Sequence, residues 1–200
     1  MDITSEMVKA LRLKTGAGMM DCKEALKAEN GNPEKAIDYL RKKGMSAATK
    51  RSSKAAKEGT IASYIHMGGR IGVLVEVNCE TDFVAKTDDF QAMARDLAMH
   101  VAASNPRYVR PEEIPTADLE REKEIYRSQL IAEKKPEKIW DKIIEGKLNK
   151  YYEEVCLLNQ KFIKNTDISV GTLVTNMMAK TGENIIVRRF ARFQLGEELG

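Results

Sequence analysis

Two alternating apolar segments joined by a pair of glycines constrain the fold of this chain more than any other feature. TIASYIHM (60–67) and RIGVLVEVNC (70–79) both alternate apolar and polar residues, which is the pattern of a half-buried strand. Gly68 and Gly69 lie between them, and a two-glycine link favours a tight β-hairpin. The second segment predicts one face of β-branched residues: Ile71, Val73, Val75 and Val77. The middle of the chain is therefore expected to be antiparallel sheet.

Residues 1–45 carry three short amphipathic patterns, each with its own start or stop signal. Ser5 is a candidate N-cap of the first helix, and Asn32 precedes a proline in the way that N-caps do. Gly44 is placed to stop the third helix. These signals predict a compact three-helix bundle that resembles ubiquitin-associated domains.

Helical patterns follow the hairpin, and NIIVRRFARFQL (184–195) then alternates as a final strand. The predicted fold class is therefore α+β, with the N-terminal bundle followed by a three-stranded antiparallel sheet covered by helices. We expect a helical module at 1–45, a basic linker at 46–58 and an α+β core at 59–200 that binds a partner.

Positive charge is concentrated in one segment. Residues 41–57 hold seven Lys or Arg and no acid, although the net charge of the whole chain is only +3. The rest of the chain is therefore mildly acidic, whereas proteins that coat nucleic acid usually spread their positive charge more widely. This segment also has no aromatic residue on which a base could stack.

Composition indicates the cellular compartment of the protein. An apolar fraction of 42% and a charged fraction of 32% are typical of a soluble globular protein. No apolar run approaches the roughly 20 residues that span a bilayer, and the N-terminal segment does not resemble a secretory leader. The cysteines are odd in number and far apart, which suits a reducing compartment: Cys22, Cys79 and Cys156. We therefore expect a cytoplasmic protein without membrane contact.

The residues that usually carry catalysis are sparse. His66 and His100 have no second ligand at metal spacing, so packing is the favoured role for both. Cys79 has acidic neighbours, Glu80 and Asp82, which disfavour a reactive thiolate. No phosphate-binding loop signature occurs. We therefore expect no catalytic residues, no metal, no cofactor and no enzymatic activity.

Two stretches are poorly explained by packing alone. In TGAGMMDCKEAL, Met19 and Met20 cannot both face the small core of a short bundle, so one is expected to be buried and the other exposed. In NCETDFVAK, Phe83 stands beside Asp82 at the end of a strand. A purely structural explanation is also open for each stretch. One Met side chain would lie over the edge of the bundle, and Phe83 would anchor the turn in the core.

These stretches carry a family resemblance. LRLKTGAGMMDCKEAL (11–26), EVNCETDFVAKTDDF (76–90) and KTGENIIVRRF (180–190) resemble segments of the elongation factor Ts family, in the expected order and spacing. The resemblance covers essentially the whole chain. It implies a guanine nucleotide exchange factor that acts on the translational GTPase elongation factor Tu. Many relatives carry two related core halves, so this chain resembles the short, single-core form, for which a homodimer is a possible active species.

The resemblance also implies site residues. Four residues match the stretch that disturbs the magnesium ion bound by the partner: Thr81, Asp82, Phe83 and Val84. Four others match partner-binding positions, three in the N-terminal module and one in the linker: Arg12, Met19, Met20 and Arg51. We expect Phe83 to insert between helices of the partner, Asp82 to act beside it, and strand pairing to hold the tip rigid.

Two other functions stay open at this point. An RNA-binding or ribosome-associated protein is the main alternative, because of the basic segment 41–57. A ubiquitin-type binding module is a weaker one that rests on the three-helix bundle alone. Low net charge and the absence of interleaved aromatics argue against direct contact with nucleic acid.

Overall fold

The computed structural model describes residues 2–51 and 53–198, and these form two compact units. Each unit is assembled from three separate stretches of the chain. The first unit contains Met1–Thr60, Val77–Ala92 and Leu173–Ile186, and the second contains Ile61–Glu76, Met93–Thr172 and Val187–Gly200. Among the described residues, no helix has both the length and the apolar character needed to cross a membrane.

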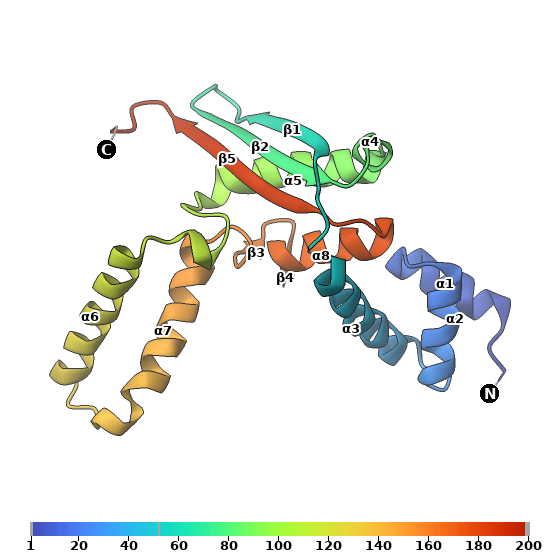
Figure 1. Ribbon diagram of the computed structural model, residues 1–200, viewed down its shortest axis with the longest axis horizontal. Coiled ribbons are helices and arrows are strands. Elements are labelled where there is room, and N and C mark those ends of the chain that lie inside the picture. Colours follow the sequence, from blue (N-terminus) through green and yellow to red (C-terminus); the bar gives the residue numbers. More distant parts are fainter. Residues whose placement is uncertain (1, 52, 199–200) are drawn as a thin grey trace. The chain divides into compact units, whose positions relative to one another are not determined.

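The N-terminal part is the expected three-helix bundle. Its helices are α1 (Ser5–Thr15), α2 (Met19–Ala28) and α3 (Pro33–Arg51) (Figure 1). They enclose a small core of buried residues: Val8, Leu11, Cys22, Ala25, Leu26 and Ala36. Asn32 caps α3 as predicted, since its side-chain oxygen accepts hydrogen bonds from the backbone N–H groups of Glu34 and Lys35 at 3.0 and 3.1 Å.

Two predicted helix boundaries are wrong. The N-cap of α1 is Thr4, whose hydroxyl accepts from the N–H of Met7, so Ser5 is the first helical residue. Gly44 does not stop α3, which continues to Arg51. A glycine inside a helix costs only about 1 kcal/mol, and here it permits close packing, because an added Cβ would lie 3.1 Å from the Cβ of Ala179. The predicted linker is thus partly helical, and the domain boundaries at 45 and 58 stay a prediction.

The sheet follows the alternation in the sequence. It is antiparallel and contains β1 (Glu58–Ile65), β2 (Ile71–Cys79) and β5 (Ile186–Gln194) in the order β1-β2-β5. Gly68 and Gly69 form the hairpin turn with φ of 85° and 68°, a conformation that favours glycine. Val73, Val75 and Val77 are buried while Leu74 is exposed, so the predicted face of β2 is confirmed.

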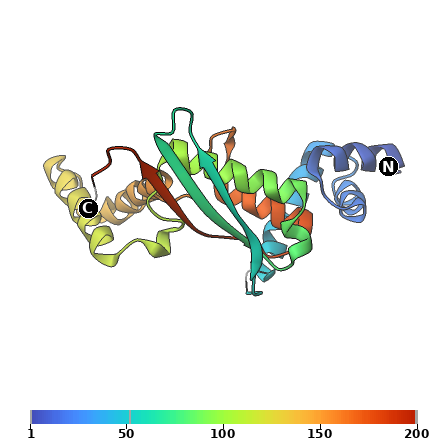
Figure 2. The same ribbon diagram turned by 90° about the horizontal axis from the view of Figure 1, so that it is seen from above.

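Helices complete the α+β architecture. Within the second unit, α5 (Asp88–Ser104) runs along one face of the sheet (Figures 1 and 2). Two antiparallel helices, α6 (Thr116–Ala132) and α7 (Trp140–Val155), extend from this unit. The shorter elements are α4 (Asp82–Ala85), η1 (Pro111–Glu113), η2 (Glu137–Ile139), β3 (Lys161–Phe162) and β4 (Asn165–Ser169). The last helix, α8 (Val170–Thr181), leads into β5. The predicted fold class is confirmed.

Candidate functional site

The segment after β2 is a single helical turn that exposes an aromatic side chain. Thr81 is the N-cap of α4, and its hydroxyl accepts a hydrogen bond from the N–H of Val84 at 3.3 Å. Consecutive side chains on a helix point in different directions, and here Phe83 is 78% exposed while Val84 is buried. Val84 therefore anchors the turn, and the alternative of a core Phe83 is excluded. The expectation of a tip held by strand pairing is also wrong, because this stretch is helical.

Asp82 lies beside Phe83 and forms an ion pair within the turn. The Nζ of Lys86 donates to Oδ2 of Asp82 at 2.6 Å, and both side chains are largely exposed. The hydrogen bond from Lys86, together with its charge, lowers the pKa of Asp82. The carboxylate is therefore ionised at neutral pH.

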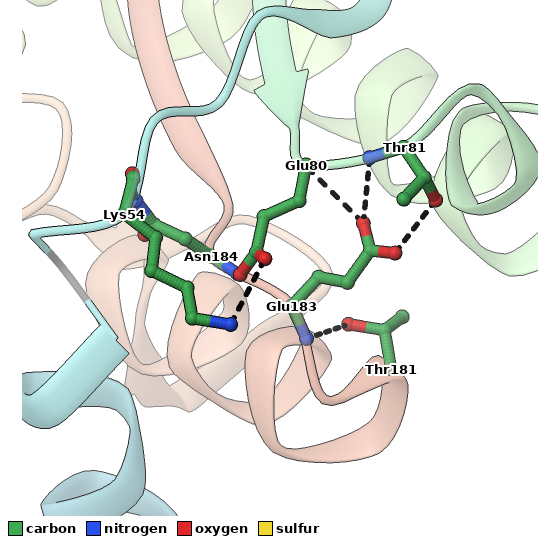
Figure 3. Close-up of polar contacts among 6 residues, drawn as sticks. All are labelled: Lys54, Glu80, Thr81, Thr181, Glu183 and Asn184. Atoms are coloured by element: carbon green, nitrogen blue, oxygen red, sulfur yellow. Dashed lines mark hydrogen bonds and ion pairs between the residues drawn. The ribbon is translucent and has the colours of Figure 1, made fainter.

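A carboxylate from a distant segment supports the turn from behind. Glu183 follows α8, and its Oε2 accepts hydrogen bonds from the backbone N–H groups of Glu80 and Thr81, both at 3.1 Å (Figure 3). Its other oxygen, Oε1, accepts from the hydroxyl of Thr81 at 2.6 Å. One side chain thus binds three donors at the start of α4. Glu183 was not among the site residues predicted from the sequence.

Glu80 in turn binds the backbone of the segment that contains Glu183. Its Oε1 accepts from the backbone N–H of Asn184 at 2.7 Å, and its Oε2 accepts from Nζ of Lys54 at 3.2 Å. The hydrogen bond from Asn184 is the main cause of the lowered pKa of Glu80. Asn184 is itself buried and donates through Nδ2 to the carbonyl of Lys54 at 2.7 Å. Three separated segments are therefore joined behind the turn, as Figure 3 shows.

Arg51 lies at the edge of this network. It is half-buried at the end of α3, and its Nη1 would lie 3.1 Å from a Cβ added to Gly182. Its charge contributes to the lowered pKa of Glu80. The structure therefore brings Arg51 close to Gly182 and into the electrostatic surroundings of Glu80, a proximity that the sequence did not predict.

The other predicted partner-binding residues lie on the N-terminal bundle. Met19 and Met20, at the start of α2, are 49% and 75% exposed, so the expectation that one of them is buried is wrong. The buried positions of this helix are occupied by Cys22, Ala25 and Leu26 instead. Arg12 is exposed on α1, and Leu13 beside it is 88% exposed. Helical periodicity would have predicted the exposure of Leu13, because Leu13 lies outside the buried apolar stripe that contains Leu11.

The surroundings of Cys79 and His100 favour a packing role over a catalytic one. Cys79 is fully buried, and its thiol donates to the carbonyl of Thr81 at 3.1 Å. His100 is also buried, and its Nδ1 accepts from the N–H of Ile163 at 3.3 Å, which leaves Nε2 to donate to Gln160 at 2.9 Å. His66 is exposed. No group of three or more His, Cys, Asp or Glu within residues 2–51 and 53–198 is arranged to hold a metal ion.

Cysteine reactivity is a direct test of these surroundings. Burial, with a smaller effect of nearby carboxylates, raises the pKa of Cys79 from 9.0 to about 11, and that of Cys156 likewise. The thiolate fraction at pH 8 is then about a hundredfold smaller than for a free thiol. We expect all three buried cysteines to react with Ellman's reagent only after denaturation. Fast labelling of the native protein at Cys79 would contradict this assignment.

Comparison with known proteins gives the class of the chain. A family described as "Elongation factor TS" matches residues 17–197. Elongation factor Ts of Syntrophus aciditrophicus is 81% identical over 199 residues, which cover 100% of this chain and 99% of the relative. The proteins of the same name from Heliobacterium modesticaldum and Geobacter sulfurreducens are 59% and 58% identical over 98% and 100% of this chain and 92% of each relative. The chain is thus a translation elongation factor. It belongs to the elongation factor Ts family.

Proposed function

We propose that this protein is a guanine nucleotide exchange factor that binds elongation factor Tu with GDP and promotes GDP release. It does so by disturbing the magnesium and phosphate site of the GTPase through Thr81, Asp82, Phe83 and Val84. The observation that carries the proposal is the 78% exposure of Phe83 on a turn whose backbone is held by Glu183. An aromatic side chain that is both exposed and held in place is suited to insertion into a partner.

Burial of Phe83 in the partner supplies energy for the release of GDP. A GTPase holds its nucleotide through a backbone phosphate cradle and a magnesium ion, and a partner accelerates release by distorting both. Burial of one aromatic side chain yields about 1.5 to 3 kcal/mol, which offsets part of the binding free energy of GDP. Since the turn is already ordered, little of that energy is lost in fixing its conformation. The coupling is reciprocal, so GDP weakens binding of the factor to the same extent.

Asp82 provides a charge next to the inserted ring. In the free protein it is paired with Lys86, but both side chains are exposed, so water and salt screen the pair and it is weak. The carboxylate can therefore exchange Lys86 for a donor of the partner at little cost. There it competes for groups that position the magnesium ion.

The N-terminal bundle provides a second contact. Met19 and Met20 offer flexible apolar side chains, and Arg12 offers a charge on the neighbouring helix. Leu13, 88% exposed on α1, is a further apolar side chain on the surface of this bundle. We assign to these residues the affinity for elongation factor Tu, and to the turn at Phe83 the acceleration of release. Arg51 is a further predicted contact, at the side of the turn.

The RNA-binding alternative is less favoured by the side-chain contacts. Within the basic segment 41–57, Lys43 forms ion pairs with Asp21 and Glu24 at 2.9 and 2.7 Å. Lys54 is paired with Glu80 at 3.2 Å. Part of the positive charge is therefore neutralised within the protein. Tight RNA binding that collapses steeply with salt would restore this alternative.

Homodimer formation and a cytoplasmic location stay predictions. The exposed face of the sheet carries three apolar side chains on which a second copy would pack: Ile61, Ile65 and Leu74. Sedimentation equilibrium tests this, and a monomer at high protein concentration would exclude it.

The exchange function has a direct test. We expect micromolar amounts of the protein to accelerate release of a fluorescent GDP analogue from elongation factor Tu in the presence of magnesium and excess unlabelled GDP. The rate should rise with factor concentration and then saturate, which gives a maximal rate and a half-saturating concentration. An unchanged release rate with folded protein would refute the proposal.

A further inference from the structure

We infer that Glu183 is a positioning residue for the exchange turn, the helical turn α4 (Asp82–Ala85) that carries Phe83. It acts on Phe83 through Thr81. This inference rests on the proposed exchange function; Glu183 lies in the segment 180–190 that resembles the family, but no role was predicted for it from the sequence. Glu183 itself is only partly exposed, and its carboxylate is directed at the backbone behind the turn, as Figure 3 shows. The carboxylate is already occupied by three donors, whereas the ring of Phe83 in the same turn is exposed.

The end of α8 sets the direction of the Glu183 side chain. α8 ends at Thr181, and Gly182 follows in the left-handed conformation with φ of 75°. The N–H of Glu183 then donates to the hydroxyl of Thr181 at 3.3 Å, which fixes the backbone from which the carboxylate projects. The end of α8 therefore determines where the carboxylate lies.

The carboxylate of Glu183 acts on the hydroxyl of Thr81. This hydroxyl donates to Glu183 at 2.6 Å and accepts from the N–H of Val84 at 3.3 Å. Because its proton is committed to the carboxylate, its lone pairs are free to accept from the helix. A hydroxyl that donates to an anion is also a better acceptor, since hydrogen bonds in a chain polarise one another. Glu183 thus strengthens the cap that holds α4 in its helical turn.

The segments around Glu80 and Glu183 each bind the backbone of the other through a carboxylate. Glu183 accepts from the backbone at Glu80 and Thr81, and Glu80 accepts from the backbone at Asn184. Each segment therefore satisfies donors of the other, and neither moves without breaking charge-assisted hydrogen bonds. This arrangement fixes the start of the turn on both sides, while the ring of Phe83 and the carboxylate of Asp82 stay exposed to a partner.

Removing the charge at Glu183 loosens the turn more than it destabilises the fold. Thr81 is exposed, so water replaces the carboxylate as the partner of its freed donors. The protein then has to order the turn when it binds, and this ordering reduces the energy available for displacing GDP. We expect Glu183→Gln to lower the maximal release rate about tenfold, the loss expected for hydrogen bonds to a charged group. The half-saturating concentration should change less than about twofold, because the N-terminal bundle is intact.

The experiment compares wild type, Glu183→Gln, Thr81→Ala and the double variant in the GDP-release assay. If Glu183 acts through Thr81, the double variant loses less than the product of the two single losses. Glu145→Gln, which alters an exposed carboxylate on α7, is the matched control and should release GDP at the wild-type rate. Hydrogen–deuterium exchange of the free proteins provides a readout that does not depend on the partner. Peptides covering 79–86 should exchange faster in Glu183→Gln while α5 is unchanged.

The outcomes separate this inference from the exchange function. Without any acceleration by wild type, the proposed function fails, and faster deuterium exchange would still show that Glu183 holds the turn. With acceleration by wild type and an equal rate for Glu183→Gln, the positioning role is overturned. Slower GDP release with unchanged deuterium exchange at 79–86 also overturns it, because Glu183 would then touch the partner directly.

Discussion

Replacing Phe83 with alanine is expected to lower the accelerated GDP-release rate about ten- to a hundredfold. This is the rate equivalent of the 1.5 to 3 kcal/mol that burial of the ring in the partner would supply, at about 1.4 kcal/mol for each factor of ten. The ring is 78% exposed in the free protein, so little packing is lost with it. The melting temperature should therefore stay within about 1 °C of wild type.

Two controls make this result specific. Ile131→Ala removes another apolar side chain, 62% exposed on α6, and should leave GDP release unchanged. Circular dichroism confirms that both variants are folded. A Phe83→Ala protein that exchanges nucleotide at the wild-type rate would refute the insertion mechanism, and one that melts many degrees lower would show that the ring packs in the core.

Phe90→Ala is expected to have the largest effect on stability. Phe90 lies in the first turns of α5 and is fully buried, in contrast to Phe83. Truncation of a buried phenylalanine costs about 3 to 5 kcal/mol through lost burial and the cavity that remains. For a chain of this length, this lowers the melting temperature by about 6 to 20 °C. Thermal and urea unfolding followed by circular dichroism measure it.

The comparison with Phe90→Leu tests the physical cause. Leucine fills most of the space left by the ring, so this variant should lose less than half as much stability as Phe90→Ala. Equal losses would indicate that the shape of the aromatic ring, and not its volume, is required. A shift of less than about 3 °C for Phe90→Ala would contradict the burial of this side chain.

The fold was predictable where its signals are local. The β1–β2 hairpin follows from alternation and two glycines, and α3 begins at the cap that Asn32 predicts. The end of α3 was not predictable, because the effect of Gly44 depends on its contact with Ala179. Local propensity is weak compared with such packing between distant segments.

Only the exposed residues of the candidate site, Phe83 and Asp82, were predictable from the sequence. Phe83 and Asp82 stand out in sequence because an aromatic beside an acid is unusual at the end of a strand. Glu183 is one glutamate among many, and its partner Glu80 lies 103 positions away. Nothing in spacing or charge links two such residues. The residues that hold the turn therefore became visible only when the chain was folded.

The reciprocal bonds between Glu80 and Glu183 have a consequence for protein synthesis. A ribosome that adds about 5 to 20 residues per second needs about 5 to 20 s to extend the chain from Glu80 to Glu183, a separation of 103 positions. By then the whole N-terminal core has been synthesised, because its buried residues and those packed against them end at Leu40. The N-terminal bundle is therefore synthesised well before Glu183, and α4 gains its hydrogen bonds to Glu183 only after these further residues have been added.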